Sequence, residues 1–209
     1  YIVFKEGTQQ VDLRIGSSFI SYEQASYNLE KEIPTTASFE DTKEKVKDSW
    51  NHYLSKVQLE GASKDELQIY YTALFHTLQF PRETSEHGKY FSAFDSKIHE
   101  GVSYNDYSLW DTFRAEHPWL QLIAPERVND MIQSLVQMYQ EGGWLPKWPN
   151  PTYSNIMIGT HADAVIADAY INGFRGYDVK TAYEAIRKNA YTPPAQDEAF
   201  RWKDRAPWN

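Results

Sequence analysis

Apolar side chains recur at helical spacing along most of the chain, and this pattern constrains the fold more than any other feature. The clearest example is a stripe with spacing i, i+3, i+4, i+7, i+8 and i+11, formed by Leu67, Tyr70, Tyr71, Leu74, Phe75 and Leu78. Such spacing puts all six side chains on one face of a helix. Ser63 and Glu66 form a capping pattern before the stripe, and Pro81 lies just past its end. The sequence therefore predicts a helix here.

Similar patterns predict further helices in succession. We expect them from Ser38 to Gly61, from near Ser108, from Pro125 to Gly142-Gly143, from Thr160 to Asn172-Gly173, and over residues 178–190. Two long loops interrupt the series, residues 82–107 and 144–159, and the first should hold a short strand or two. Consecutive helices favour antiparallel helix hairpins over βαβ units.

The N-terminal segment has a different pattern. Val11, Leu13 and Ile15 alternate with polar residues, which is typical of a half-buried strand, so residues 1–22 are predicted to be β. Residues 23–37 are interpreted as a connector, because the Ile33-Pro34 pair disfavours helix entry. We therefore predict two domains, residues 1–35 and 36–209.

Composition excludes several classes of protein. The 209 residues carry a net charge of −8 and no cysteine, with 41% apolar and 24% charged residues. The acidic balance argues against a nucleic-acid partner, and the lack of cysteine excludes disulfides, thiolate zinc sites and cysteine nucleophiles in this chain. No stretch reaches the ~18 consecutive apolar residues of a membrane span. There is no phosphate-binding Gly-rich loop, nucleophile elbow or His-Glu-x-x-His motif.

A first cluster of candidate functional residues begins at the expected helix start at Ser108. Asp111 stands at the third helical position, where a carboxylate either completes a capping box or accepts hydrogen bonds from sugar hydroxyls in a concavity. Trp110 would stack beside such a sugar, and Arg114 would hold the carboxylate through two hydrogen bonds. His117 would donate to a hydroxyl, although a lone histidine is more often structural.

A second cluster repeats the arrangement at Thr160. Asp163 stands at the third helical position, and the same two alternatives apply. His161 and Asp163 resemble a metal-ligand spacing only weakly, and with no further His or Cys nearby we expect no transition-metal site. We predict that Asp111 and Asp163 point into a shared hollow fringed by tryptophan.

A third cluster is the loop that follows Gly142-Gly143, which contains Trp144 and Trp148 among prolines. One interpretation is a rigid loop whose tryptophans anchor it to the core. The other is a sugar-binding platform, with the prolines holding Trp144 or Trp148 in place.

Three motifs resemble those of glycoside hydrolase family 92, and they occur in the same order as in that family. They are Ser108-Leu109-Trp110-Asp111-Thr112-Phe113-Arg114, Gly142-Gly143-Trp144-Leu145-Pro146, and Gly159-Thr160-His161-Ala162-Asp163-Ala164-Val165-Ile166-Ala167-Asp168-Ala169-Tyr170. The segment from Ser18 to Leu29 looks like the exit from that family's N-terminal β-sandwich. The resemblance implies a mixed, mainly α chain: the end of a β-sandwich followed by the first helices of an (α/α)6 toroid.

The resemblance also implies an activity, calcium-dependent and inverting exo-hydrolysis of α-mannosides, often the α-1,2 links of high-mannose N-glycans or mannan. Asp111 matches the family's aspartate that binds the terminal mannose, and Trp110, His161 and Asp163 match neighbouring motif positions. By resemblance, the parent protein is expected to be bacterial and secreted, periplasmic or at the cell surface.

The family's catalytic acid and base motifs do not occur in this sequence. They would follow residue 209, together with most calcium ligands, so we expect this chain to be an internal piece of a longer protein. Inversion needs an acid and a base roughly 6.5–9.5 Å apart, so the isolated chain is expected to be inactive. Two alternatives remain: a non-catalytic carbohydrate-binding scaffold, and an (α/α)-toroid glycosidase of other specificity.

Overall fold

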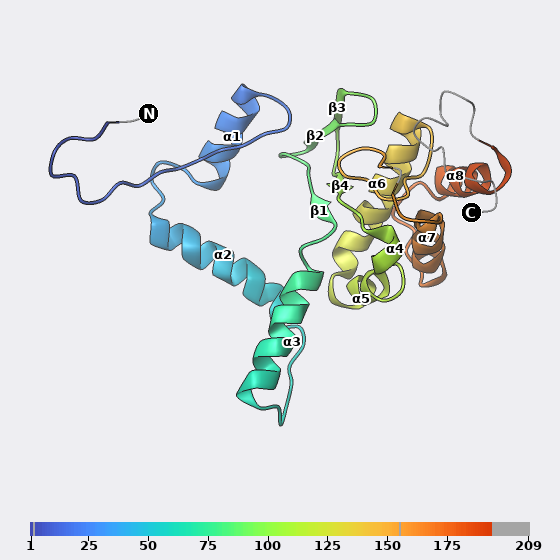
Figure 1. Ribbon diagram of the computed structural model, residues 1–209, viewed down its shortest axis with the longest axis horizontal. Helices are drawn as coiled ribbons and strands as arrows, with labels where there is room; N and C mark the ends of the chain where they lie inside the picture. Colours follow the sequence, from blue (N-terminus) through green and yellow to red (C-terminus); the bar gives the residue numbers. More distant parts are fainter. Residues whose placement is uncertain (2, 155, 194–209) are drawn as a thin grey trace. The chain divides into compact units, whose positions relative to one another are not determined.

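The computed structural model describes residues 1, 3–154 and 156–193 (Figure 1). The chain divides into two compact units, Tyr1–His52 and Tyr53–Asn209, and the division falls inside helix α2 (Phe39–Leu54). Residues 194–209 of the predicted second domain lie outside the described part, and the domain boundary near residue 35 stays a prediction.

The first unit corrects two expectations about the N-terminal segment. Its described residues before Ser21 form no strand, and Tyr22–Glu32, expected to be part of a connector, forms helix α1. A strand is stable only when it pairs with a neighbour, and the described residues of this unit provide none. The alternating side chains of Val11, Leu13 and Ile15 are exposed as a result.

Helix α1 forms because its start is capped and one face is covered. Ser21 accepts a hydrogen bond from the Gln24 backbone N–H at 3.1 Å, as an N-cap should. The Asn28 amide donates to the Ser17 carbonyl at 3.0 Å, which ties the preceding extended segment to the helix. Gly16 allows this approach, since a Cβ there would lie 2.4 Å from the Ala25 carbonyl oxygen.

The second unit contains most of the predicted helices. They are α3 (Lys64–Thr77), α4 (Leu109–Thr112), α5 (Glu116–Ile123), α6 (Pro125–Gly142), α7 (His161–Ile171) and α8 (Val179–Tyr191). The capping box predicted at Ser63 is present. The helix expected from near Ser108 is instead two helices, because the chain turns between α4 and α5.

The loop 82–107 folds into two short antiparallel pairs. Strand β1 (Arg82–Glu83) pairs with β4 (Tyr104–Asn105), and β2 (Lys89–Ser92) pairs with β3 (Lys97–Glu100) as a hairpin. The expectation of short strands in this loop is therefore confirmed.

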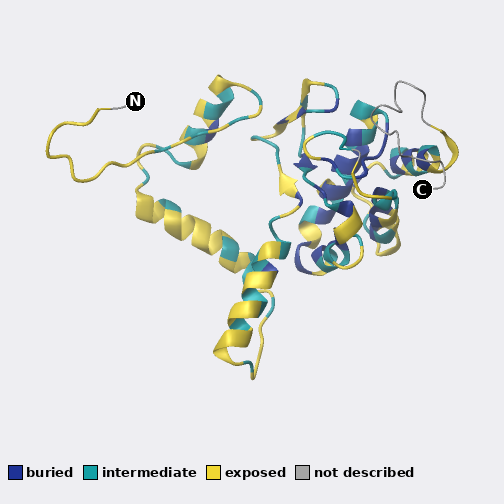
Figure 2. Cartoon of the chain, in the orientation of Figure 1, coloured by how far each residue is buried: buried dark blue, intermediate teal, exposed yellow. Residues whose placement is uncertain are grey.

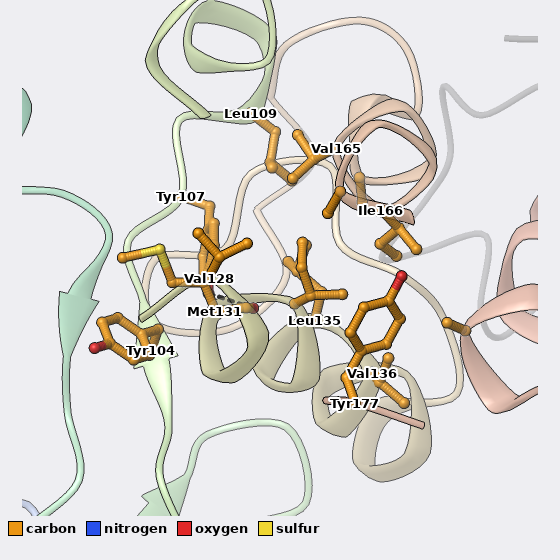
Figure 3. Packing of buried hydrophobic residues seen from close by; sticks show 14 of the residues in the cluster. Tyr104, Tyr107, Leu109, Val128, Met131, Leu135, Val136, Val165, Ile166 and Tyr177 are labelled. Carbon is orange, nitrogen blue, oxygen red and sulfur yellow. Dashed lines mark hydrogen bonds between the residues drawn. The ribbon is translucent and has the colours of Figure 1, made fainter. Parts of the chain in front are cut away.

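The core of the second unit is built around α6, which contacts α5, α7, α8 and β4. Figure 3 shows its side chains Val128, Met131, Leu135 and Val136 packed among buried residues of neighbouring segments. The Tyr107 hydroxyl, itself buried, donates to the Met131 carbonyl at 2.8 Å. In Figure 2 the buried residues gather on α6 and its neighbours, whereas α2 is exposed or half-buried along its length. The mainly helical character predicted from the sequence is confirmed.

Candidate functional site

Helix α4 presents Asp111 at the surface of the second unit. The Ser108 hydroxyl donates to Asp111 Oδ2 at 2.6 Å, and Ser108 makes no side-chain bond to the helix backbone. The Ser108 hydroxyl thus holds the Asp111 carboxylate, but the capping box is not formed because Ser108 does not bond the helix backbone. Asp111 is exposed, and its Oδ1 atom has no protein partner among the described residues. That oxygen is available to accept a hydrogen bond from a ligand.

Arg114 lies on aromatic rings rather than on the Asp111 carboxylate. Its guanidinium carbon is 4.4 Å from the centroid of Trp110 and 4.6 Å from that of Phe113, and it donates to the Trp110 carbonyl. The predicted two-bond contact with Asp111 is wrong. Because α4 ends at Thr112, Arg114 is not one helical turn beyond Asp111 on a continuous helix. Cation–π contact instead holds Arg114 against Trp110 and Phe113.

The same aromatic group joins the first motif to the second. Phe113 stacks on His161, with ring centroids 4.2 Å apart and planes inclined by 4°. Gly159 has φ +90°, and a Cβ there would lie 2.9 Å from His161 Nε2, so glycine suits this position in two ways. Burial, and then the charge of Arg114, lower the pKa of His161. Neutral imidazole can both donate and accept a hydrogen bond.

Asp163 points to α8 rather than back onto its own cap. Its Oδ1 accepts a hydrogen bond from the buried Asn189 amide at 2.8 Å, while Thr160 makes no side-chain capping bond. The capping alternative therefore does not describe Asp163. The shared hollow for Asp111 and Asp163 stays a prediction.

The loop after α6 is fixed by buried contacts. Gly143 ends the helix with φ +89°, and Trp144, only 1% exposed, lies under the Lys188 ammonium at 4.4 Å. The Tyr153 hydroxyl donates to the Trp144 carbonyl at 2.6 Å and accepts from its N–H at 3.0 Å. The anchoring interpretation thus describes Trp144. Trp148 is half-buried, and its indole N–H has no hydrogen-bond partner among the described residues.

Two ionisable residues at the start of α5, Glu116 and His117, are buried enough to shift their pKa values. His117 is 6% exposed and stacks on Tyr107, and burial lowers its pKa to about 4. Its Nε2 atom is buried without a protein partner in the described part of the chain. Burial and the nearby Asp111 charge raise the pKa of Glu116 to about 7. His117 therefore stays neutral, and its contact with a hydroxyl stays a prediction.

Sequence reasoning assigned no role to Phe113, Lys188 or Asn189. Phe113 lies in the first motif, directly before Arg114. An aromatic residue next to an arginine could have predicted the cation–π contact that the structure has. Lys188 and Asn189 belong to α8, far from either motif in sequence, and no local pattern connects them with Trp144 or Asp163.

The described residues hold neither a cluster of metal ligands nor a helix able to span a membrane. Residues 1, 3–154 and 156–193 contain no group of three or more His, Cys, Asp or Glu side chains placed to hold a metal ion. In that same part of the chain, no helix combines the length and apolar character that crossing a membrane requires.

Comparison with known proteins identifies the family of this arrangement. The chain is similar to an inverting mannosidase of family GH92 from Bacteroides thetaiotaomicron, with 35% identity and a TM-score of 0.82, covering 87% of this chain and 25% of that one. It is also similar to an α-mannosidase of that family from the same bacterium in complex with mannoimidazole, with 29% identity and a TM-score of 0.78, over 83% of this chain and 23% of that one.

A secreted glycosidase of Arthroderma benhamiae, described as uncharacterized, is 27% identical over 193 residues, 90% of this chain and 21% of that protein. The chain thus spans about a quarter or less of each relative's length. The family model for the glycosyl hydrolase family 92 catalytic domain matches residues 24–207 of this sequence. The chain belongs to glycosyl hydrolase family 92.

Proposed function

We propose that the protein containing this chain is an exo-α-mannosidase, and that the chain supplies the part of its site that binds the terminal mannose. The family and its mannosidase members support the reaction class. The relative solved with mannoimidazole supports a mannoside as the substrate class. Within the family, α-1,2 links of high-mannose N-glycans or mannan are our proposed substrate.

One observation supports this assignment most directly: the continuous stack that joins Trp110, Arg114, Phe113 and His161. It brings the α4 motif and the start of α7 together on one surface. Asp111, which is exposed, directly follows Trp110 of this stack in the sequence. Carboxylates that accept hydroxyl hydrogen bonds beside aromatic faces are the usual components of a sugar site.

In this proposal Asp111 binds and orients mannose and transfers no proton. Its Oδ2 is held by Ser108, so Oδ1 accepts from a sugar hydroxyl in a fixed position. His161, with its lowered pKa, remains neutral; its ring bonds the Ile158 backbone, and its other ring nitrogen is proposed to accept from a sugar hydroxyl. Trp110, 38% exposed, presents an apolar surface next to both. The acid and base of an inverting reaction are proposed to lie beyond residue 209.

Calcium is part of the proposal for the whole protein only. The described residues do not fit a calcium site, because they offer no suitable cluster of carboxylates. We propose that its ligands also lie beyond residue 209, and we derive no step of the reaction through the ion. Secretion or exposure at the cell surface is proposed because the relative from Arthroderma benhamiae is described as secreted.

The test is hydrolysis of aryl glycosides by the full-length protein, with and without a chelator. We expect turnover of α-mannosides, inversion of the anomeric product by NMR, and loss of activity on chelation. Preference for another glycoside would support a different specificity. Mannoside binding without turnover would support a non-catalytic scaffold instead.

A further inference from the structure

A polar cleft lies between the β2–β3 hairpin and α6, and none of the residues assigned above belongs to it. Its volume is 490 Å³, within the range of small-molecule sites. The lining side chains that matter here are Tyr90, Asp95, Lys97 and His99 from the hairpin, and Gln137 and Glu141 from α6.

Glu141 is the main acceptor in this cleft. Its side chain is 10% exposed, and the Tyr90 hydroxyl donates to its Oε1 atom. Burial, and then this hydrogen bond, raise the pKa of Tyr90. Glu141 Oε2 has no protein hydrogen-bond partner among the described residues. A carboxylate oxygen can accept more than one hydrogen bond, so Glu141 Oε2 has capacity for a ligand donor.

Gln137 provides a second acceptor. Its amide nitrogen donates to the Val102 carbonyl at 3.2 Å, which fixes the orientation of the amide. With the nitrogen so placed, Gln137 Oε1 is buried and has no partner in the described part of the chain. Buried acceptors of this kind are uncommon in native proteins and call for an explanation.

The hairpin side of the cleft is preorganised by His99. Its Nε2 atom lies 3.0 Å from Asp95 Oδ2 and 3.9 Å from Glu141 Oε1, and its ring stacks on Tyr90 with centroids 5.4 Å apart. The Asp95 carboxylate is thereby held at a fixed position beside the imidazole. Such prior ordering reduces the entropy that a ligand loses on binding.

The hydrogen-bonding groups of the cleft suit a hydroxylated ligand, and its charged groups are the carboxylates of Asp95, Glu100 and Glu141 and the ammonium of Lys97. Lys97 Nζ lies 3.6 Å from Asp95 Oδ2, so an ammonium already neutralises that part of the cleft. A hydroxyl can donate to Glu141 and Gln137 and can also accept from Lys97, whereas an ammonium ligand can only donate.

We propose that this cleft binds a sugar unit, with Glu141 and Gln137 accepting hydrogen bonds from its hydroxyls. The choice of mannose as the sugar rests on the proposed function, whereas the contacts of the cleft indicate a hydroxylated ligand. The proposal adds a second sugar-binding position, on α6, to the one at Asp111.

The test is calorimetric titration of the full-length protein with methyl α-mannoside and with α-1,2-mannobiose. Glu141→Gln keeps the shape of the side chain and an acceptor for Tyr90 but removes the charge. We expect it to weaken binding at one class of site about tenfold. Glu184→Gln, a charge-matched change on α8, should leave both classes unchanged, and Asp111→Asn should leave the Glu141-dependent class unchanged. Gln137→Met, which removes only an amide, decides the matter if Glu141→Gln does not fold.

The outcomes separate this inference from the proposed function. Unchanged sugar binding in both Glu141→Gln and Gln137→Met would overturn the second site and leave the mannosidase proposal standing. Glu141-dependent binding of sugars in a protein that hydrolyses no mannoside would remove the proposed function and leave this site. Glu141-dependent binding of 1,3-diaminopropane in place of either sugar would show a cation site and overturn the inference.

Discussion

Phe113 and His161 lie face to face, with ring centroids 4.2 Å apart and planes inclined by only 4°. Phe113 directly follows α4 and His161 begins α7, so one ring contact joins two motifs that are distant in sequence. Arg114 lies 4.6 Å over the Phe113 ring and continues the stack to Trp110. The order of this surface depends on the stack.

Removing the charge of Arg114 should raise the pKa of His161. The pKa of His161 is lowered by burial and then by the positive charge of Arg114, so Arg114→Met removes the second cause and leaves the first. NMR titration of the histidine ring measures the change. Arg175→Met, at a guanidinium that lies over Tyr170, is the matched control and should have no effect. An unchanged His161 titration in Arg114→Met would show that the two groups do not interact.

Tyr153→Phe should destabilise the protein by about 1–3 kcal/mol, because it removes a hydroxyl that bonds both the N–H and the carbonyl of Trp144. Denaturant unfolding measures this loss. Tyr183→Phe, at an exposed tyrosine, should change stability by less than about 0.5 kcal/mol. Equal effects of the two substitutions would mean that the hydroxyl does not hold the loop.

His117 should make the protein less stable in acid. Its folded-state pKa of about 4 lies below the ordinary 6.5, so the unfolded chain gains a proton that the folded chain does not. Stability is therefore lost as pH falls from about 6.5 to 4, with a cost of about 3 kcal/mol. His117→Leu should flatten this part of the pH profile, whereas His76→Leu, at an exposed histidine, should not. An acid limb identical to that of the unaltered protein would count against a neutral buried His117.

Glu116 should have the opposite effect in a neighbouring pH range. Its folded-state pKa is raised to about 7 from 4.5, so the folded chain keeps a proton that the unfolded chain has released. Stability then falls as pH rises from about 4.5 to 7. Glu116→Gln should raise the melting temperature at pH 8 and leave it nearly unchanged at pH 4.5. Glu184→Gln is the control, and a Glu116→Gln variant that is no more stable at pH 8 would contradict the prediction.

The helices of the second unit were predictable because their cause is local. The stripe ending at Leu78 and the capping box at Ser63 both act within a few turns, and the structure has both. Pro125 at the start of α6 and Gly143 after its end likewise act through their own backbone geometry.

The N-terminal segment was harder to predict because a strand is stable only with a pairing partner, and its own sequence does not identify that partner. The alternation of Val11, Leu13 and Ile15 indicates how a strand would face, but no segment of the described first unit pairs with it. The Ile33-Pro34 pair led to the prediction of a connector, although the proline follows helix α1, which begins at the Ser21 cap.

In the candidate site, sequence patterns located the motifs but not their contacts. The positions of Asp111 and Asp163 in their helices were predictable from capping rules. That Arg114 would lie on Trp110, and that Asn189 would bond Asp163, depends on how α4 and α8 are placed, which is a matter of tertiary packing.

The central claim is that Asp111 binds the mannose unit that the full-length protein cleaves. The most direct measurement is kcat/KM for an aryl α-mannoside in Asp111→Asn, with Asp48→Asn, at an exposed residue of α2, as the control. Loss of a charged hydrogen bond should lower kcat/KM by about 10- to 100-fold in Asp111→Asn, with little change in melting temperature. A kcat/KM equal to that of the control variant would contradict the claim.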